Sequence, residues 1–152
     1  MPGDAIRTLR LAPEFADEAA RVLRASFDDR LPWLASLHTP EEDRWFLHNR
    51  VFAECAVWGA TDGAVLLGFV AFRPGWIDQI YVLPERQGYG IGASLLAIAK
   101  AGESELSLWT FQRNAPARRF YEKHGFIAVE ETDGSRNEER EPDIRYRWRR
   151  GD

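Results

Sequence analysis

A turn of three alternating glycines, Gly88, Gly90 and Gly92, lies between two apolar stretches and constrains the fold more than any other feature of the chain. The stretch before it, residues 76–83, is rich in β-branched and aromatic residues and predicts a strand. Backbone N–H groups exposed at a helix entrance, with the positive end of the helix dipole, suit a phosphate group. The turn therefore predicts an anion site for a phosphorylated cofactor. The stretch after it, residues 90–101, predicts an amphipathic helix with one apolar face formed by Ile91, Leu95, Ile98 and Ala99.

The glycine spacing by itself also fits two other kinds of turn. Gly88-x-Gly90 followed by Ala93 loosely matches the dinucleotide fingerprint G-x-G-x-x-G/A of dehydrogenases. That fingerprint normally opens a first βαβ unit, and the roughly 60 residues after this turn are too few for a second mononucleotide-binding half. A glycine turn that binds no ligand is the remaining alternative.

A second strand–helix pair follows the first. Residues 105–110 predict a short strand, and residues 114–124 predict a helix. Asn114 suits the N-cap, Pro116 is tolerated in the first turn, and Gly125 ends the helix.

Two motifs stand out in these strand–helix pairs. The first is Gln87-x-x-Gly90-x-Gly92 after Val82-Leu83-Pro84, and the second is Asn114 followed by Phe120-Tyr121 and Gly125-Phe126. Together, the two motifs resemble those of the GNAT family of N-acetyltransferases. The resemblance covers residues 76–130 specifically, and the whole chain in length and element order.

The remaining patterns complete a predicted α/β fold, with a mixed central sheet of about seven strands and helices on both faces, similar to that of the family. Thr39-Pro40-Glu41-Glu42 is a capping box that announces a helix through about Asn49. The other expected elements are a strand at 6–11, a helix from Pro13, strands at 52–59 and 65–73 joined by a turn at 61–63, and closing strands at 126–132 and 143–149.

Length and composition limit the class of protein. We expect the 152 residues to form one acetyltransferase domain, residues 1–152. No apolar run reaches about 18 residues, so no membrane span is expected. The net charge of −4 argues against a nucleic-acid binder and mildly favours cationic small substrates. A single cysteine, Cys55, and a start without the pattern of a secretory signal predict a cytoplasmic protein.

The resemblance implies acetyl-CoA as co-substrate, bound in a notch where two neighbouring parallel strands splay apart. Backbone groups of Ile80, Tyr81 and Val82 would meet the pantetheine arm, as in the pairing of an added strand. Asn114 would touch the pantetheine end of the cofactor, or would serve only as a helix N-cap. The pyrophosphate would meet backbone N–H groups at Gln87, Gly88, Gly90, Ile91 and Gly92.

The resemblance also implies direct transfer of the acetyl group to a primary amine, without an acyl-enzyme. The sulfur of CoA leaves with negative charge, and the phenol of Tyr121 could protonate it. The alternative makes Tyr121 a core aromatic whose hydroxyl is bonded elsewhere. A backbone N–H, that of Val82, would hold the oxyanion of the tetrahedral intermediate.

The predicted general base is a carboxylate near the acetyl group. Asp78 leads because it lies in the apolar cofactor strand, where alternation puts Asp78, Ile80 and Val82 on one face. Burial beside Ile80 would raise its pKa, as a base near neutrality requires. A solvated or salt-bridged Asp78 is the other interpretation, and Glu54 is the second candidate.

The acceptor amine, from a small molecule or a peptide, is expected near residues 28–38 and 137–143, which carry aromatic and acidic side chains. The histidines His38, His48 and His124 show no metal-binding spacing, so no metal is expected. Edge pairing through the last strand would allow a homodimer. The alternative function is a non-catalytic acyl-CoA-binding or sensing module of the same fold.

Overall fold

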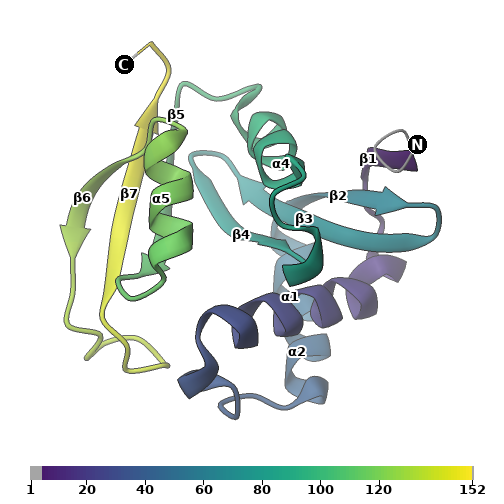
Figure 1. The fold of residues 1–152 in the computed structure, drawn as a ribbon, viewed down its shortest axis with the longest axis horizontal. Coiled ribbons are helices and arrows are strands. Elements are labelled where there is room, and N and C mark those ends of the chain that lie inside the picture. The colour runs from purple at the N-terminus through teal and green to yellow at the C-terminus, as the bar shows by residue number, and fades with distance from the viewer. Residues whose placement is uncertain (1–4, 152) are drawn as a thin grey trace.

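A seven-stranded sheet forms the centre of the computed structural model, which describes residues 5–151 (Figure 1). Its strand order is β1-β2-β3-β4-β5-β7-β6, and all neighbours are antiparallel except β4 and β5. The predicted mixed sheet is therefore confirmed. The strands are β1 (Ile6–Arg10), β2 (Ala56–Asp62), β3 (Val65–Arg73), β4 (Trp76–Val82), β5 (Glu105–Phe111), β6 (Ile127–Glu131) and β7 (Asp143–Arg149).

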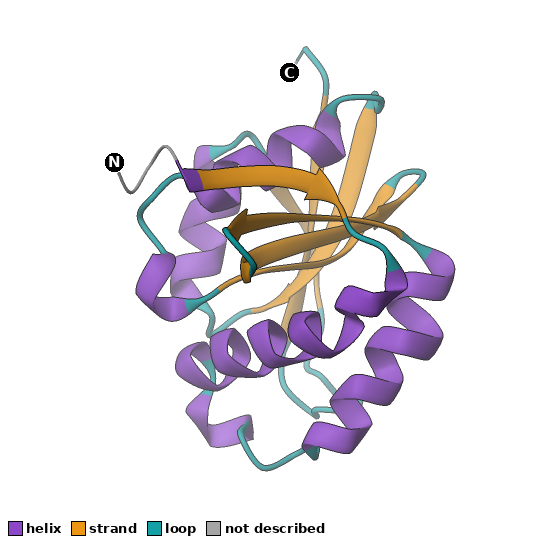
Figure 2. Cartoon of the chain, turned by 90° about the vertical axis from the view of Figure 1, so that its right-hand side faces the viewer, coloured by secondary structure: helices purple, strands orange, loops and turns teal. Residues whose placement is uncertain are grey.

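Helices cover both faces of the sheet, as predicted (Figure 2). None of the helices within residues 5–151 is long and apolar enough to cross a membrane. The α-helices are α1 (Ala16–Arg30), α2 (Pro40–Phe46), α3 (Phe52–Glu54), α4 (Ile91–Lys100) and α5 (Ala115–Lys123). Short 3₁₀ turns span Pro13–Phe15, Pro32–Leu34 and Pro84–Arg86, and a π-helical turn spans Leu47–Val51.

Two apolar clusters hold the layers together. The α4 and α5 helices bury one cluster against the sheet, and its fully buried members include Leu95, Leu108 and Tyr146. The α1 helix buries the second cluster on the opposite face, where Ala19, Val22 and Leu23 repeat at helical spacing and meet Phe69 of β3. One face of the sheet is thus covered by α4 and α5, and the other by α1.

The second helical region is longer than predicted. Its capping box is confirmed: the Thr39 side chain accepts from the Glu42 backbone N–H, and Glu42 accepts from that of Thr39. The expected strand at 52–59 is wrong in its first half, because helical turns continue to Glu54 and β2 begins at Ala56. Leu47 and Val51 are fully buried in the α1 cluster, so tertiary packing overrides the strand propensity of this segment.

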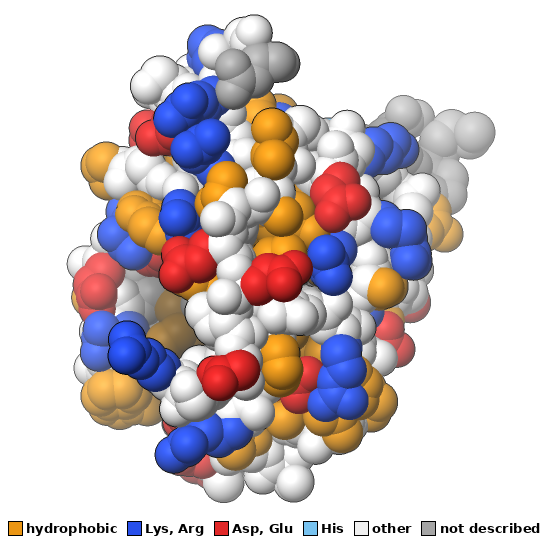
Figure 3. Space-filling model, turned by 90° about the vertical axis from the view of Figure 1, so that its left-hand side faces the viewer, with side chains coloured by type: hydrophobic (Ala, Val, Ile, Leu, Met, Phe, Trp, Pro, Cys, Tyr) orange, Lys and Arg blue, Asp and Glu red, His pale blue; other side chains and the backbone are white. Residues whose placement is uncertain are grey.

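The last strand is not an edge of the sheet. β7 pairs with β5 on one side and with β6 on the other, so the predicted dimer contact through the last strand is wrong. The outer strands are β1 and β6. Seen from the β6 side, the surface carries charges of both signs and a hollow containing hydrophobic side chains (Figure 3). Arg145 of β7 is paired with Glu130 of β6 at 3.0 Å.

Two irregularities shape β4. The first is a β-bulge: Ala71 and Phe72 of β3 pair with Gln79 and Ile77, which leaves Asp78 as the extra residue. The second is its short contact with β5. Within residues 5–151, Trp76 pairs with Ser107, and the Ser107 N–H donates to the Gly75 carbonyl at 2.9 Å. Beyond that pair the two parallel strands separate (Figure 1). This separation supplies the notch that the sequence led us to expect.

Candidate active site

A cavity of about 580 Å³ opens where β4 and β5 separate. Its walls come from both faces of the sheet: the end of α1 on one side, and the start of α4 and the inner face of α5 on the other. Of the predicted site residues, the cavity brings together Ile80, Tyr81, Val82, Gln87, Gly88, Gly90, Ile91, Gly92, Asn114, Tyr121 and Asp78.

Within residues 5–151, β4 presents to this cavity backbone groups that no neighbouring strand pairs. The Leu83 N–H donates to the Leu67 carbonyl of β3 at 2.8 Å. Because backbone groups of successive residues in an antiparallel strand point to opposite sides, those of Val82 and Ile80 face away from β3, toward the gap. The backbone of Tyr81 instead faces β3, so its predicted backbone role is wrong, although its side chain lines the cavity.

The glycine turn delivers the chain into α4 with unused donors. Gly88 and Gly90 have φ of +89° and +81°, in the left-handed region that favours glycine. Gly90 is the N-cap of α4, and among residues 5–151 no side chain caps this helix. The first turn therefore leaves N–H groups free for an anion at the positive end of the helix dipole.

Gly92 is required for packing as well. A β-carbon at this position would lie 3.2 Å from the Phe120 ring, a contact tighter than side chains normally make. Glycine here lets α4 approach α5 across the mouth of the cavity.

Asn114 caps α5, as the sequence indicated. Its side-chain oxygen accepts the Ala117 N–H at 3.3 Å. The residue also lines the cavity, so the cap holds Asn114 within reach of a ligand.

Tyr121 is buried, at 7% exposure, and lines the cavity from α5. Its ring packs on Phe126 and Tyr146 with centroid separations of 5.8 and 5.9 Å. Within the described part of the chain, the Tyr121 hydroxyl makes no hydrogen bond. Every fully buried side-chain N or O atom there does have a hydrogen-bond partner, so this hydroxyl is not fully buried. The hydroxyl is therefore open to the cavity. Burial raises the pKa of Tyr121 well above its usual range, so the phenol stays protonated near neutral pH.

Asp78 differs from the predicted buried base. It is exposed, and its carboxylate accepts from the Arg73 side chain at 2.7 Å and from the Cys55 thiol at 3.2 Å. Cys55, the thiol partner of Asp78, packs against the α1 cluster, whereas Ile80 and Val82 pack against the cluster on the other face of the sheet. The expectation that Asp78 shares a face with Ile80 and Val82 is therefore wrong. The bulge at Asp78 breaks the strand alternation on which that expectation depended.

Glu54 lies outside the cavity lining and is paired with Arg50 at 2.6 Å on the helical segment before β2. Cys55, next to it, has its pKa raised to about 12, chiefly by burial, and is held as a neutral thiol. Neither residue offers a reactive group to the cavity.

Sequence reasoning assigned no role to the side chain of Tyr81, and it included Arg30 in the acceptor segment 28–38 without giving it a role of its own; both line the cavity. Burial raises the pKa of Tyr81 to about 12. Arg30 ends α1 and extends the spacing of Leu23 and Phe27 by a further turn. A charged residue continuing an apolar stripe is the signal that could have identified it.

The two predicted acceptor segments meet beside the cavity. Trp33 donates to the buried carboxylate of Glu141 at 3.0 Å, and Arg113 donates twice to the same carboxylate at 2.7 Å. The Arg113 guanidinium also lies 4.1 Å from the Trp33 ring centroid. One buried acid thus joins the loop after α1, the β5–α5 loop and the β6–β7 loop.

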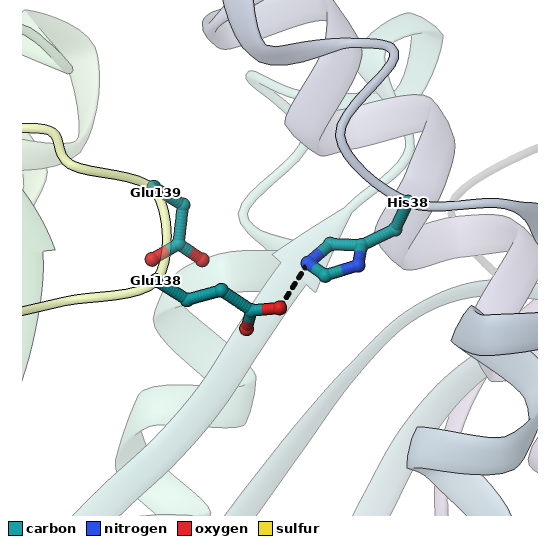
Figure 4. Close-up of side chains that lie close together, drawn as sticks. All are labelled: His38, Glu138 and Glu139. Carbon is teal, nitrogen blue, oxygen red and sulfur yellow. Dashed lines mark ion pairs between the residues drawn. The ribbon is translucent and has the colours of Figure 1, made fainter.

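A second contact between these loops is the ion pair of His38 with Glu138 at 3.4 Å (Figure 4). Potential ligand atoms of His38, Glu138 and Glu139 lie within 4.8 Å of one another. Spacing along the chain could not have revealed this group, because its members come from distant loops. The predicted absence of a metal rested on that spacing and stays a prediction.

Residues 53–128 match the acetyltransferase (GNAT) domain, and the chain belongs to this family. Among curated relatives, the uncharacterized N-acetyltransferase YafP of Escherichia coli K12 is 32% identical over 91 residues, 60% of this chain and 57% of that protein. The peptidyl-lysine N-acetyltransferase YiaC of the same organism is 32% identical over 85 residues, 55% of this chain and 58% of YiaC. The chain thus matches little more than half the length of either relative.

Solved structures with the same fold include two that match nearly the whole chain. Apo YjaB from Escherichia coli has a TM-score of 0.79 at 21% identity, covering 94% of this chain and 97% of YjaB. The PaiA N-acetyltransferase from Thermoplasma acidophilum, solved in complex with coenzyme A, has a TM-score of 0.71 at 23% identity, covering 95% and 98%. These likenesses agree with the predicted fold class.

Proposed function

We propose that the chain is an acetyl-CoA-dependent N-acetyltransferase that transfers acetyl directly to a primary amine, with residues 1–152 working as one domain. The observation that carries the proposal is the geometry of one cavity. It combines the backbone of β4 that faces the gap to β5, the uncapped glycine entrance of α4 and the open hydroxyl of Tyr121.

The residues present fit the cofactor. Backbone groups of Ile80 and Val82 would pair with the amides of the pantetheine arm, as with an added strand. The turn from Gln87 to Gly92 would hold the pyrophosphate through N–H groups and the α4 dipole. The related fold of PaiA, solved with coenzyme A, supports this assignment.

Tyr121 is the proposed proton donor. The amine nitrogen attacks the acetyl carbon, the carbon–sulfur bond breaks, and the sulfur takes up the phenolic proton of Tyr121. The Val82 N–H, which faces the gap, would hold the developing oxyanion. Solvent then restores the proton to the phenol.

Asp78 is retained as the candidate base because it lines the cavity and Glu54 does not. Its ion pair with Arg73 has to loosen before the carboxylate can take a proton from the attacking amine. Since that carboxylate is solvent-exposed, a water molecule is a suitable relay.

The acceptor side is proposed to be the junction of the α1–α2 and β6–β7 loops, where Glu138 and Glu139 could attract an ammonium group. YiaC is named a peptidyl-lysine acetyltransferase, so peptide lysines belong in the acceptor panel beside small amines. A homodimer and a cytoplasmic location stay predictions, as does the lack of a nucleic-acid partner.

Titration calorimetry with acetyl-CoA, CoA and NAD tests the proposal first. We expect acetyl-CoA and CoA to bind, and Gly90→Glu to abolish binding, because its side chain would enter a turn with φ of +81° and put a negative charge at the phosphate site. Gly102→Glu is the matched control, since a β-carbon there meets nothing within 4 Å. Binding of NAD alone would overturn the proposal. Thiol release with an amine panel then separates an enzyme from a non-catalytic acyl-CoA-binding module.

A further inference from the structure

Arg30 reaches the glycine turn from the opposite face of the sheet. It is the last residue of α1, yet its guanidinium donates a hydrogen bond to the side-chain oxygen of Gln87. The nitrogen of the same carboxamide donates to the Val82 carbonyl at 3.0 Å. A continuous chain of hydrogen bonds therefore runs from α1 through the turn to the open edge of β4.

The Gln87 carboxamide occupies a position suited to an incoming ligand. The Val82 carbonyl faces the gap between β4 and β5, where no neighbouring strand pairs with it within residues 5–151. A carboxamide that donates to this carbonyl has the same donor and acceptor groups as each amide of a pantetheine arm. Gln87 thus makes the contact that such an amide would make.

The Arg30 guanidinium has unused donors in a confined position. Its side chain is only 23% exposed, and its carboxylate neighbour, Asp29, is 3.9 Å away, beyond hydrogen-bond length. Burial lowers the pKa of Arg30, and Arg119 nearby acts in the same direction. A guanidinium carries five N–H donors, and a partly desolvated cation facing a cavity favours an oxygen ligand.

We propose that Arg30 is a cofactor-binding residue contributed by α1. When the cofactor enters, one of its amides replaces the Gln87 carboxamide at Val82, and Arg30 donates to a cofactor oxygen. That oxygen belongs to an amide carbonyl of the pantetheine arm or to a phosphate. The inference rests on the proposed function, since it requires coenzyme A in the cavity.

Titrations of the unchanged protein and Arg30→Met with CoA and with pantetheine test the role of Arg30. We expect Arg30→Met to weaken CoA binding about tenfold, as for loss of a charge-assisted hydrogen bond. Weakening of both ligands would assign the oxygen to the arm, and weakening of CoA alone would assign it to a phosphate. Arg21→Met is the matched control, because Arg21 is exposed on the same helix. Equal CoA affinities of Arg30→Met and the unchanged protein would overturn the inference.

The Gln87→Ala background separates a direct contact from an indirect one. If Arg30 binds the cofactor, Arg30→Met weakens CoA binding by a similar factor whether residue 87 is glutamine or alanine. An effect that disappears in Gln87→Ala would mean that Arg30 only positions Gln87, which contradicts the inference. Should the unchanged protein fail to bind CoA at all, the proposed function itself falls, and the inference falls with it.

Discussion

Two phenols face the same cavity, and burial suppresses the ionisation of both. Tyr121 enters from α5 and Tyr81 from β4, and each has a raised pKa because burial disfavours the charged phenolate. Both therefore remain donors at neutral pH. The hydroxyl of Tyr146 contacts Glu122 and Arg118 instead, at 2.6 and 3.0 Å, which is a structural use of the same group.

Tyr121→Phe is expected to lower kcat by about 10²-fold, the lower range for loss of a general acid. The affinity for CoA should change less than about twofold, because the ring and its packing remain. Steady-state kinetics and calorimetry on one preparation measure both quantities. Tyr146→Phe is the contrasting variant: it should lower the free energy of unfolding by about 1 kcal/mol with a smaller effect on rate. A Tyr121→Phe enzyme with normal kcat would remove Tyr121 from the chemistry.

The raised pKa of the buried Tyr81 also predicts that stability falls in alkaline solution. The folded-state pKa of Tyr81 is about 12, while an unperturbed tyrosine titrates near 10. Between about pH 10 and pH 12 the unfolded chain loses this proton first, so the free energy of unfolding decreases as pH rises. Urea denaturation at pH 9, 10 and 11 measures the slope. Tyr81→Phe should give a shallower decrease than the unchanged protein, and identical slopes would contradict the assignment.

At the level of elements, the β6–β7 loop depends on close backbone packing. Gly134 has φ of +82°, and a β-carbon there would lie 2.4 Å from the carbonyl carbon of Glu141. Glu141 is 3% exposed and anchors Trp33 and Arg113. A displaced loop would therefore disturb the proposed acceptor side while leaving β4 and the glycine turn in place.

Gly134→Ala should raise KM for the amine several-fold and lower the free energy of unfolding by more than the roughly 1–2 kcal/mol of a left-handed backbone alone. Gly63→Ala is the matched control, since Gly63 has φ of +61° but its β-carbon would meet nothing within 4 Å. It should show the backbone cost without the change in KM. Equal KM values in the two variants would argue against a role of this loop in acceptor binding.

Local signals explain which elements could be predicted. The glycine turn, the Thr39 capping box and the N-cap at Asn114 use neighbours within four residues, and all three are present. Residues 47–54 could not be assigned in this way, because burial of Leu47 and Val51 against α1 decides for helix.

The candidate site was predictable to the extent that it follows the chain. Arg30 contacts Gln87 across 57 positions of sequence, and no local pattern encodes that contact. The bulge that turns Asp78 away from Ile80 depends on the register between β3 and β4 and is equally invisible in a single strand. Long-range pairing therefore accounts for the errors at the site.

Across the whole molecule, the sheet consists of two antiparallel parts joined along β4 and β5. Each strand from β1 to β4 pairs with the next, and β7 pairs with both β5 and β6. Between the two parts, Trp76 and Ser107 are the paired residues in the chain that the structure describes. Beyond that pair the two strands separate (Figure 1), and residues of both line the cavity. Within residues 5–151, the backbone groups of β4 that face the gap have no neighbouring strand to protect them.

A ligand in the notch should therefore stabilise the join as well as the fold. CoA at 100 times its Kd should add about 2.7 kcal/mol by mass action, which raises Tm by roughly 5–10 °C for a chain of this size. Hydrogen exchange should slow most at Ile80 and Val82, whose N–H groups face the gap, and least in β1 and β2. Thermal unfolding and amide exchange with and without CoA measure both effects. A rise in Tm with protection confined to the α4 turn would place the cofactor on the glycines but outside the notch.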